Sequence, residues 1–219
     1  MTRRVFAPGC AMMLYKPELA GKLLMVLNKH FGKIEMLTTC CRHDPGFTEP
    51  TEIINVCPGC DKRFRSLYAN VTTVSLWEVV AQREDEFLLP NYFREQMTIL
   101  DACPARDRPA IHEAIRTLLN RMNIILTEPA NTRTNSTCCG DSFYPQLPVE
   151  KVNELMCKRT EELPHKNVVV YCVSCIQSVA IGGKTPRYLP DLLMGLQTNV
   201  KVLPTEVWHQ ELDAYIERH

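Results

Sequence analysis

Ten of the eleven cysteines in this chain fall into two copies of one pattern: a lone cysteine, an adjacent pair and a Cys-x-x-Cys motif. The members are Cys10, Cys40, Cys41, Cys57 and Cys60 in the first copy, and Cys103, Cys138, Cys139, Cys172 and Cys175 in the second. Each copy has five thiols, one more than a tetrahedral zinc site uses. Thiolates from distant parts of a chain suit soft metals and iron–sulfur clusters. The pattern indicates metal-centred redox chemistry.

The composition is that of a globular protein with a packed core and balanced charge. The chain has 219 residues, 45% of them hydrophobic, and 25 basic residues balance 25 acidic ones. Zero net charge gives no long-range attraction to nucleic acid, so we expect no nucleic-acid partner. No apolar run reaches the roughly 18 residues that a membrane span needs, so we expect no membrane span.

We expect the protein to be cytoplasmic. Arg3-Arg4 superficially resembles a twin-arginine export signal, but Pro8 and Gly9 interrupt the segment, and cleavage would remove Cys10 from the pattern. A reducing cytoplasm disfavours a disulfide framework and leaves the thiols available as ligands.

Short apolar runs alternate with amphipathic helical stretches in both halves of the chain. The expected strands are 5–7, 34–37, 53–56, 97–100, 124–126 and 168–170. The expected helices begin at Pro17 and Pro109 or span 58–68, 74–80, 149–163 and 204–219. The segment 188–193 echoes 75–80, which strengthens the interpretation as a repeat.

The pattern predicts an α/β fold of two pseudo-repeated, small Rossmann-like units, each a parallel sheet flanked by helices. The predicted domains are 1–88, and 93–219 with a closing helix; the best linker is Asp85 to Tyr92. Loops at the carboxyl ends of parallel strands meet in one crevice, which would bring distant cysteines together. Adjacent cysteines such as Cys138-Cys139 point in different directions, so they suit a polynuclear centre better than one small ion.

In its order of cysteines, the chain resembles the CCG-domain proteins, which share the cysteine-rich domain of heterodisulfide reductase. The second copy is closer, with Cys103, Cys138-Cys139-Gly140, Cys172 and Cys175 separated by 34 residues (104 to 137) and 32 residues (140 to 171). The first copy departs from the pattern because Arg42 replaces the glycine and only 15 residues (42 to 56) precede Cys57.

The resemblance implies a noncubane four-iron four-sulfur cluster held by five cysteines, with one or two clusters in the chain. The shortened first copy leaves a smaller cluster or zinc open there, because four of its five cysteines would suffice for zinc. It implies an iron–sulfur oxidoreductase or electron-transfer subunit that reduces a disulfide or a small redox substrate. The implied partner is a flavoprotein or a ferredoxin-like subunit. It assigns no catalytic side chain, and no cofactor ligand beyond the ten cysteines.

Two other functions remain open. Thiolates could stabilise a non-enzymatic, zinc-binding interaction module. Alternatively, Cys57-x-x-Cys60 could exchange disulfides directly, although this leaves the paired cysteines unexplained.

Other features receive no metal-binding role. Cys157 lies outside both copies on a helical stretch and is expected to be a packing residue. His43 follows Cys41 closely and could protonate a thiolate, but a solvated loop histidine is the simpler interpretation. Gly182-Gly183-Lys184 lacks the rest of a phosphate loop and predicts a helix-terminating turn. The sequence contains no GxGxxG, so flavin or nicotinamide would bind a partner subunit.

Overall fold

The computed structural model describes residues 3–83 and 87–219. It divides into two compact units. The first unit contains the described residues up to Phe87 together with Glu211–His219, and the second unit is Leu88–Gln210. The structure thus groups the last nine residues with the first unit, whereas the sequence places them with the second. Part of the expected linker, Asp85 and Glu86, lies outside the described residues.

The first unit contains a four-stranded parallel sheet in the order β2-β1-β3-β4. Its strands are β1 (Arg3–Ala7), β2 (Glu35–Met36), β3 (Thr51–Asn55) and β4 (Val71–Ser75). Its helices are α1 (Cys10–Tyr15), α2 (Pro17–Phe31), α3 (Pro58–Leu67) and α4 (Leu76–Ala81).

The second unit repeats this sheet in the order β6-β5-β7-β8, again with all strands parallel. Its strands are β5 (Gln96–Ile99), β6 (Ile125–Thr127), β7 (Asn167–Val170) and β8 (Thr185–Tyr188). Its α-helices are α5 (Pro109–Arg121), α6 (Val149–Glu161), α7 (Val173–Ile181) and α8 (Leu189–Leu193), and its 3₁₀ turns are η1 (Cys103–Ala105), η2 (Arg133–Asn135) and η3 (Asp141–Phe143). Helix α9 (Thr205–Ile216) begins in the second unit, and its residues from Glu211 onward belong to the first.

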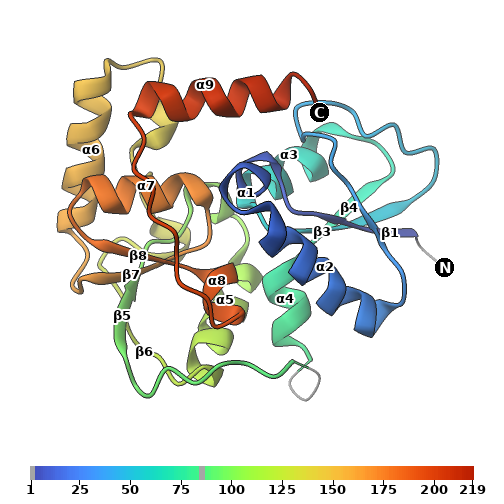
Figure 1. The fold of residues 1–219 in the computed structure, drawn as a ribbon, viewed down its shortest axis with the longest axis horizontal. Coiled ribbons are helices and arrows are strands. Elements are labelled where there is room, and N and C mark those ends of the chain that lie inside the picture. Colours follow the sequence, from blue (N-terminus) through green and yellow to red (C-terminus); the bar gives the residue numbers. More distant parts are fainter. Residues whose placement is uncertain (1–2, 84–86) are drawn as a thin grey trace. The chain divides into compact units, whose positions relative to one another are not determined.

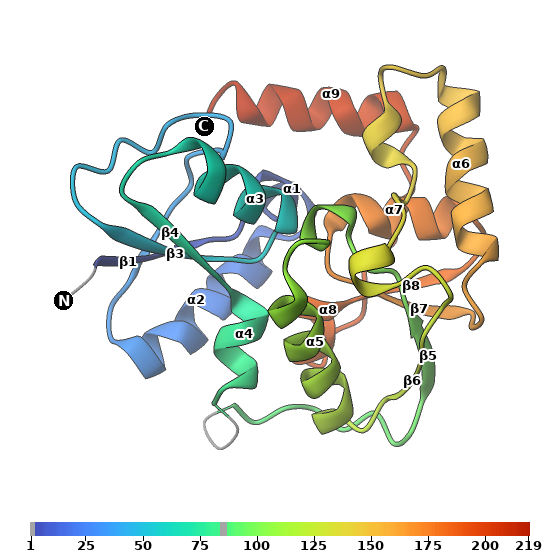
Figure 2. The ribbon, with the colours of Figure 1, turned by 180° about the vertical axis from the view of Figure 1, so that it is seen from behind.

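The two sheet orders confirm the predicted fold class. In each sheet the first and third strands in sequence lie side by side, and their connections leave in opposite directions. Right-handed crossovers then place helices on both faces of the sheet. In the first unit α2 and α3 lie on opposite sides of the sheet (Figure 1), and in the second unit α5 and α7 do so (Figure 2). None of the described helices combines the length and apolar character needed to cross a lipid bilayer.

The central strands are apolar because both of their faces are covered. Ile53, Ile54, Val168 and Val169 are fully buried, as expected for parallel strands between two layers of helices. The helices α2, α3 and α5 begin at proline residues, as predicted. Proline already has a helical φ, and the amide hydrogen that it lacks would have no hydrogen-bond partner in the first turn of a helix.

The predicted helix over 74–80 is wrong at its start, because Val74 and Ser75 end strand β4. Helix α4 begins only at Leu76, where Ser75 acts as its N-cap. The Ser75 side chain accepts the N–H of Trp77 at 3.2 Å, and the Glu78 carboxylate accepts the N–H of Ser75 at 3.0 Å. This capping box fixes the boundary. In the second unit α8 likewise follows β8 directly, but its N-cap Tyr188 makes no side-chain capping hydrogen bond.

Helix α6 packs against α7 and η3 in the second unit, whereas residues 42–56 of the first unit, all of them described, contain strand β3 and no helix. This difference explains why glycine follows the pair only in the second copy. Gly140 has φ +109, and a Cβ there would lie 2.7 Å from Met156 Cγ and 2.9 Å from Met156 N on α6. The shorter segment of the first unit supplies no such helix, so Arg42 fits.

We predict that Gly140→Ala lowers the free energy of unfolding by about 2–4 kcal/mol, through overpacking and a left-handed backbone. Gly183→Ala is the matched control, because φ there is +79 but nothing lies within 4 Å of the added Cβ. Gly183→Ala should lower the free energy of unfolding by only about 1 kcal/mol. Urea unfolding of the two variants checks this difference, and equal losses would contradict it.

Candidate functional site

The cysteines of the first copy lie where strands β1, β2 and β3 end. Cys10 is the first residue of α1, Cys57 is the N-cap of α3, and Cys60 lies in the first turn of α3. Cys40 and Cys41 lie in the loop after β2, within residues 37–50, which contain no helix or strand. Carboxyl ends of parallel strands meet at one edge of a sheet, which accounts for their gathering.

These five thiols form a row of neighbouring contacts. The Cys40 thiol is hydrogen-bonded to the thiols of Cys10 and Cys41. Cys41 in turn contacts Cys60, and Cys60 contacts Cys57. All except Cys57 are buried, and Cys57 is half-buried.

Gly9 allows this close approach in the first unit. It has φ +85, and a Cβ there would lie 3.2 Å from Cys60 Sγ and 3.3 Å from Cys57 Cβ. A side chain at this position would therefore press on two of the thiol-bearing residues.

The second unit contains an equivalent row. Cys138 is hydrogen-bonded to Cys103 and Cys139, Cys139 contacts Cys175, and Cys175 contacts Cys172. The structure thus brings together, in each unit, the five cysteines of one copy of the pattern. Their role as metal ligands stays a prediction.

The first cysteine of each pair is the hydrogen-bond acceptor of its row. Hydrogen bonds from the thiols of Cys10 and Cys41 lower the pKa of Cys40 to about 2. The backbone N–H of Arg42 also donates to Cys40 Sγ, at 3.4 Å. As the donor to Cys40, Cys41 has its pKa raised to about 12. These contacts favour the thiolate form of Cys40, and a metal that binds several thiolates would release protons from the other thiols.

The second row has the same electrostatic order. Hydrogen bonds from the thiols of Cys103 and Cys139 hold the pKa of Cys138 well below its usual range. The backbone N–H of Gly140 donates to Cys138 Sγ at 3.3 Å, and the Ser142 hydroxyl lies 2.9 Å from the same sulfur. The pKa of Cys139 is raised to about 12, first by the hydrogen bond to Cys138.

All the donors of both rows are thiols, the ligand type that soft metals and iron–sulfur clusters take. Within residues 3–83 and 87–219, no group of three or more His, Cys, Asp or Glu side chains is arranged around a single metal position. The thiols follow one another in a row instead. A cluster of several iron atoms can take ligands at separate points, and thiolate is its usual protein ligand.

A buried carboxylate near the second row was not found by sequence reasoning. The Asp101 side chain is fully buried and accepts two hydrogen bonds from Arg116, at 2.8 and 2.7 Å. It also accepts the Thr132 hydroxyl at 2.7 Å, the Arg133 N–H at 2.8 Å and the Tyr171 hydroxyl at 3.0 Å. Burial alone would raise the pKa of Asp101, but the hydrogen bonds and charge of Arg116 hold it well below its usual range.

These partners connect Asp101 to all three cysteine-bearing segments of the second unit. Asp101 precedes Cys103 by two residues, Tyr171 directly precedes Cys172, and Thr132 lies on the segment that leads to Cys138. The only sequence signal is an acidic residue directly after a buried strand. Pro8 occupies the matching position in the first unit, two residues before Cys10.

The paired cysteines of the first unit are held differently, by the C-terminal segment Glu211–His219. The Cys40 N–H donates to the His219 carbonyl oxygen at 3.0 Å, and Arg42 pairs with Asp213 at 3.1 Å. The exposed His43 ring contacts the Ile216 carbonyl oxygen at 3.0 Å. His43 therefore has a structural partner in this loop.

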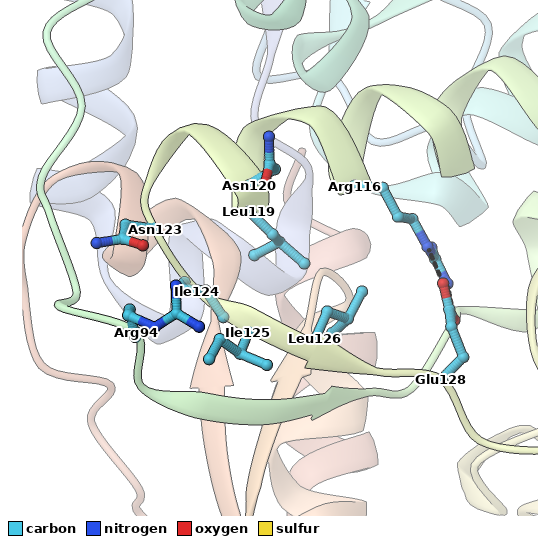
Figure 3. A pocket seen from close by; sticks show the side chains of 9 residues that line it. All are labelled: Arg94, Arg116, Leu119, Asn120, Asn123, Ile124, Ile125, Leu126 and Glu128. Carbon is cyan, nitrogen blue, oxygen red and sulfur yellow. Dashed lines mark hydrogen bonds and ion pairs between the residues drawn. The ribbon is translucent and has the colours of Figure 1, made fainter.

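A separate hollow of about 420 Å³ lies between α5 and β6 in the second unit (Figure 3). Apolar side chains of Leu119, Ile125 and Leu126 line it, with Arg94 and Arg116 also at its wall. None of its lining residues is a cysteine. The hollow therefore belongs to the helix–sheet packing of this unit and not to the thiol row.

Comparisons with known proteins leave the family open. No protein-family model matches the chain, and no curated protein matches it significantly. Among solved structures the chain is similar to an aspartate racemase from Picrophilus torridus, with 9% identity over 96% of this chain and 94% of that one and a TM-score of 0.34. So remote a likeness does not bear on the chemistry. The CCG-domain resemblance stays a prediction.

We predict that Asp101→Asn destabilises the metal-free protein by about 2–3 kcal/mol, because it removes a buried charge that accepts several hydrogen bonds, although Arg116 keeps its ion pair with Glu128. Glu154→Gln is the control, since Glu154 forms exposed ion pairs with Lys151 and Lys158, and such pairs contribute little. Thermal unfolding under reducing, anaerobic conditions checks the ranking. Similar melting temperatures for both variants would refute the role of Asp101.

Proposed function

We propose that this protein binds iron–sulfur clusters at its two thiol rows and works as an iron–sulfur oxidoreductase or electron-transfer subunit. The observation that supports this most directly is the repetition. Five thiols contact one another in the same order at the same strand ends of two units. Chance burial of small apolar cysteines would not reproduce that order.

The cluster type we propose is the noncubane four-iron four-sulfur cluster of the CCG-domain proteins, in one or both units. The second unit has the closer match, through Cys138-Cys139-Gly140. In the first unit four of the five thiols would suffice for zinc, so zinc is the alternative occupant there.

The chain's own residues prepare each row for ligands that carry negative charge. Cys57 and Cys172 are the N-caps of α3 and α7, where the positive end of the helix dipole favours thiolate. Backbone N–H groups donate to the first sulfur of each pair. In the first row, four of the five thiols are buried, which keeps water away from them. When bound, an iron–sulfur cluster would supply the ability to accept and release single electrons.

The proposed reaction is the reduction of a disulfide or a similar small redox substrate. A disulfide takes up two electrons and two protons and gives two thiols. The electrons must come from a partner, for which a flavoprotein or a ferredoxin-like protein is the proposed class. The sequence contains no dinucleotide-binding GxGxxG of its own.

One observation favours a second candidate, direct thiol–disulfide exchange. Cys57 is half-buried at the N-terminus of α3, and Cys60 is buried behind it, an arrangement that suits an attacking and a resolving thiol. Exchange needs only this pair. It gives no role to Cys40 and Cys41, or to the second row.

Metal analysis after anaerobic purification tests the proposal. We expect a brown protein with iron and acid-labile sulfide. Cys139→Ser should abolish the share of iron held by the second unit, about half if both rows bind clusters, because it removes a central thiol of that row. Cys41→Ser should do the same for the first unit.

Cys157→Ser is the matched control, because Cys157 lies outside both rows on α6 and should leave the iron content unchanged. A colourless protein with stoichiometric zinc would replace the proposal with the zinc-stabilised module. A metal-free protein that reduces disulfides through Cys57 would favour exchange. Equal iron in Cys139→Ser, Cys41→Ser and the parent would refute the ligand assignment.

A further inference from the structure

A side chain contacts the first sulfur of the cysteine pair in the second thiol row. In the second unit, Ser142 follows Cys138 by four residues, and its hydroxyl lies 2.9 Å from Cys138 Sγ. The residue four positions after Cys40 in the first unit is Asp44, whose carboxylate accepts the N–H of Gly46 at 2.8 Å. A carboxylate has no proton to donate. The first row therefore lacks a hydroxyl donor at the matching position.

The backbone contacts of the two rows do not create this difference. The N–H of Arg42 donates to Cys40 Sγ at 3.4 Å, and the N–H of Gly140 donates to Cys138 Sγ at 3.3 Å. Each row therefore has the same backbone donor at the same place. The Ser142 hydroxyl is an addition to the second row.

The direction of its effect follows from charge. A sulfur that ligates a metal has lost its proton, so the Ser142 hydroxyl must be the donor in the contact with Cys138. Reduction of a cluster adds negative charge to the cluster and its ligands. A donor to a ligand sulfur stabilises that charge and raises the reduction potential.

Solvent exposure acts in the same direction. In the second row Cys103, Cys138 and Cys172 are half-buried, whereas in the first row only Cys57 is. Water near a cluster stabilises the added negative charge better than apolar side chains do.

We infer that Ser142 tunes the second thiol row, raising the reduction potential of its cluster so that this site accepts electrons before the first one. The inference rests on the proposed function and adds an order of reduction to it. Ser142 acts through the Cys138 sulfur and is a positioning residue, not a ligand.

The test is a redox titration of the anaerobically purified holoprotein with dithionite, followed by electron paramagnetic resonance. The Cys41→Ser background isolates the second unit's signal. In that background Ser142→Ala should make reduction about tenfold less favourable, the upper range for a single hydrogen bond, which is a fall of about 59 mV for one electron. Ser142→Thr keeps the hydroxyl and should restore the parent potential.

Asp44→Ala is the matched control and should leave the second unit's potential unchanged. An unshifted potential in Ser142→Ala with full iron content would overturn the inference and leave the proposed function standing. Loss of iron in Ser142→Ala would also overturn it, because Ser142 would then hold the loop and not tune the cluster. Absence of iron from the parent protein would instead refute the proposed function.

Discussion

The thiol rows depend on the order of the strands in each sheet, where the two central strands are adjacent in space but not consecutive in the sequence. Strands β1 and β3, and likewise β5 and β7, lie side by side with their connections leaving in opposite directions. The crevice beyond their carboxyl ends is where open α/β sheets place ligands. Cys10 and Cys57 lie there because one follows β1 and the other caps the helix after β3. The paired cysteines reach the same edge after β2.

The two units support the same arrangement by different means. In the second unit a buried carboxylate at Asp101 connects the segments that carry Cys103, Cys138 and Cys172. The first unit has Pro8 at that position, and its described residues between the cysteine pair and Cys57 form no helix equivalent to α6. Its cysteine pair is instead held through Cys40, whose N–H donates to the His219 carbonyl oxygen of the C-terminal segment Glu211–His219. Equivalent thiol contacts thus persist on two different sets of supporting residues.

The sequence predicted most strands, the helix starts at proline and the repeat, because buried apolar runs and proline leave strong local signals. It missed β4 (Val71–Ser75), a largely half-exposed strand without an apolar run, and its helix over 74–80 therefore began too early. It also missed β8 (Thr185–Tyr188), which likewise has no apolar run. It also missed Asp101, because a single acidic residue after a strand reveals nothing of partners 15 to 70 residues away. The Cys40–His219 contact could not be predicted either, since no pattern connects positions so far apart.

The first unit is discontinuous in sequence, so it cannot complete its folding when most of it has been synthesised. Residues up to Phe87 leave the ribosome long before Glu211–His219, which complete this unit. The Cys40 N–H therefore lacks its acceptor, the His219 carbonyl oxygen, until the whole second unit has been synthesised. The unit whose synthesis begins first is therefore the unit that is completed last.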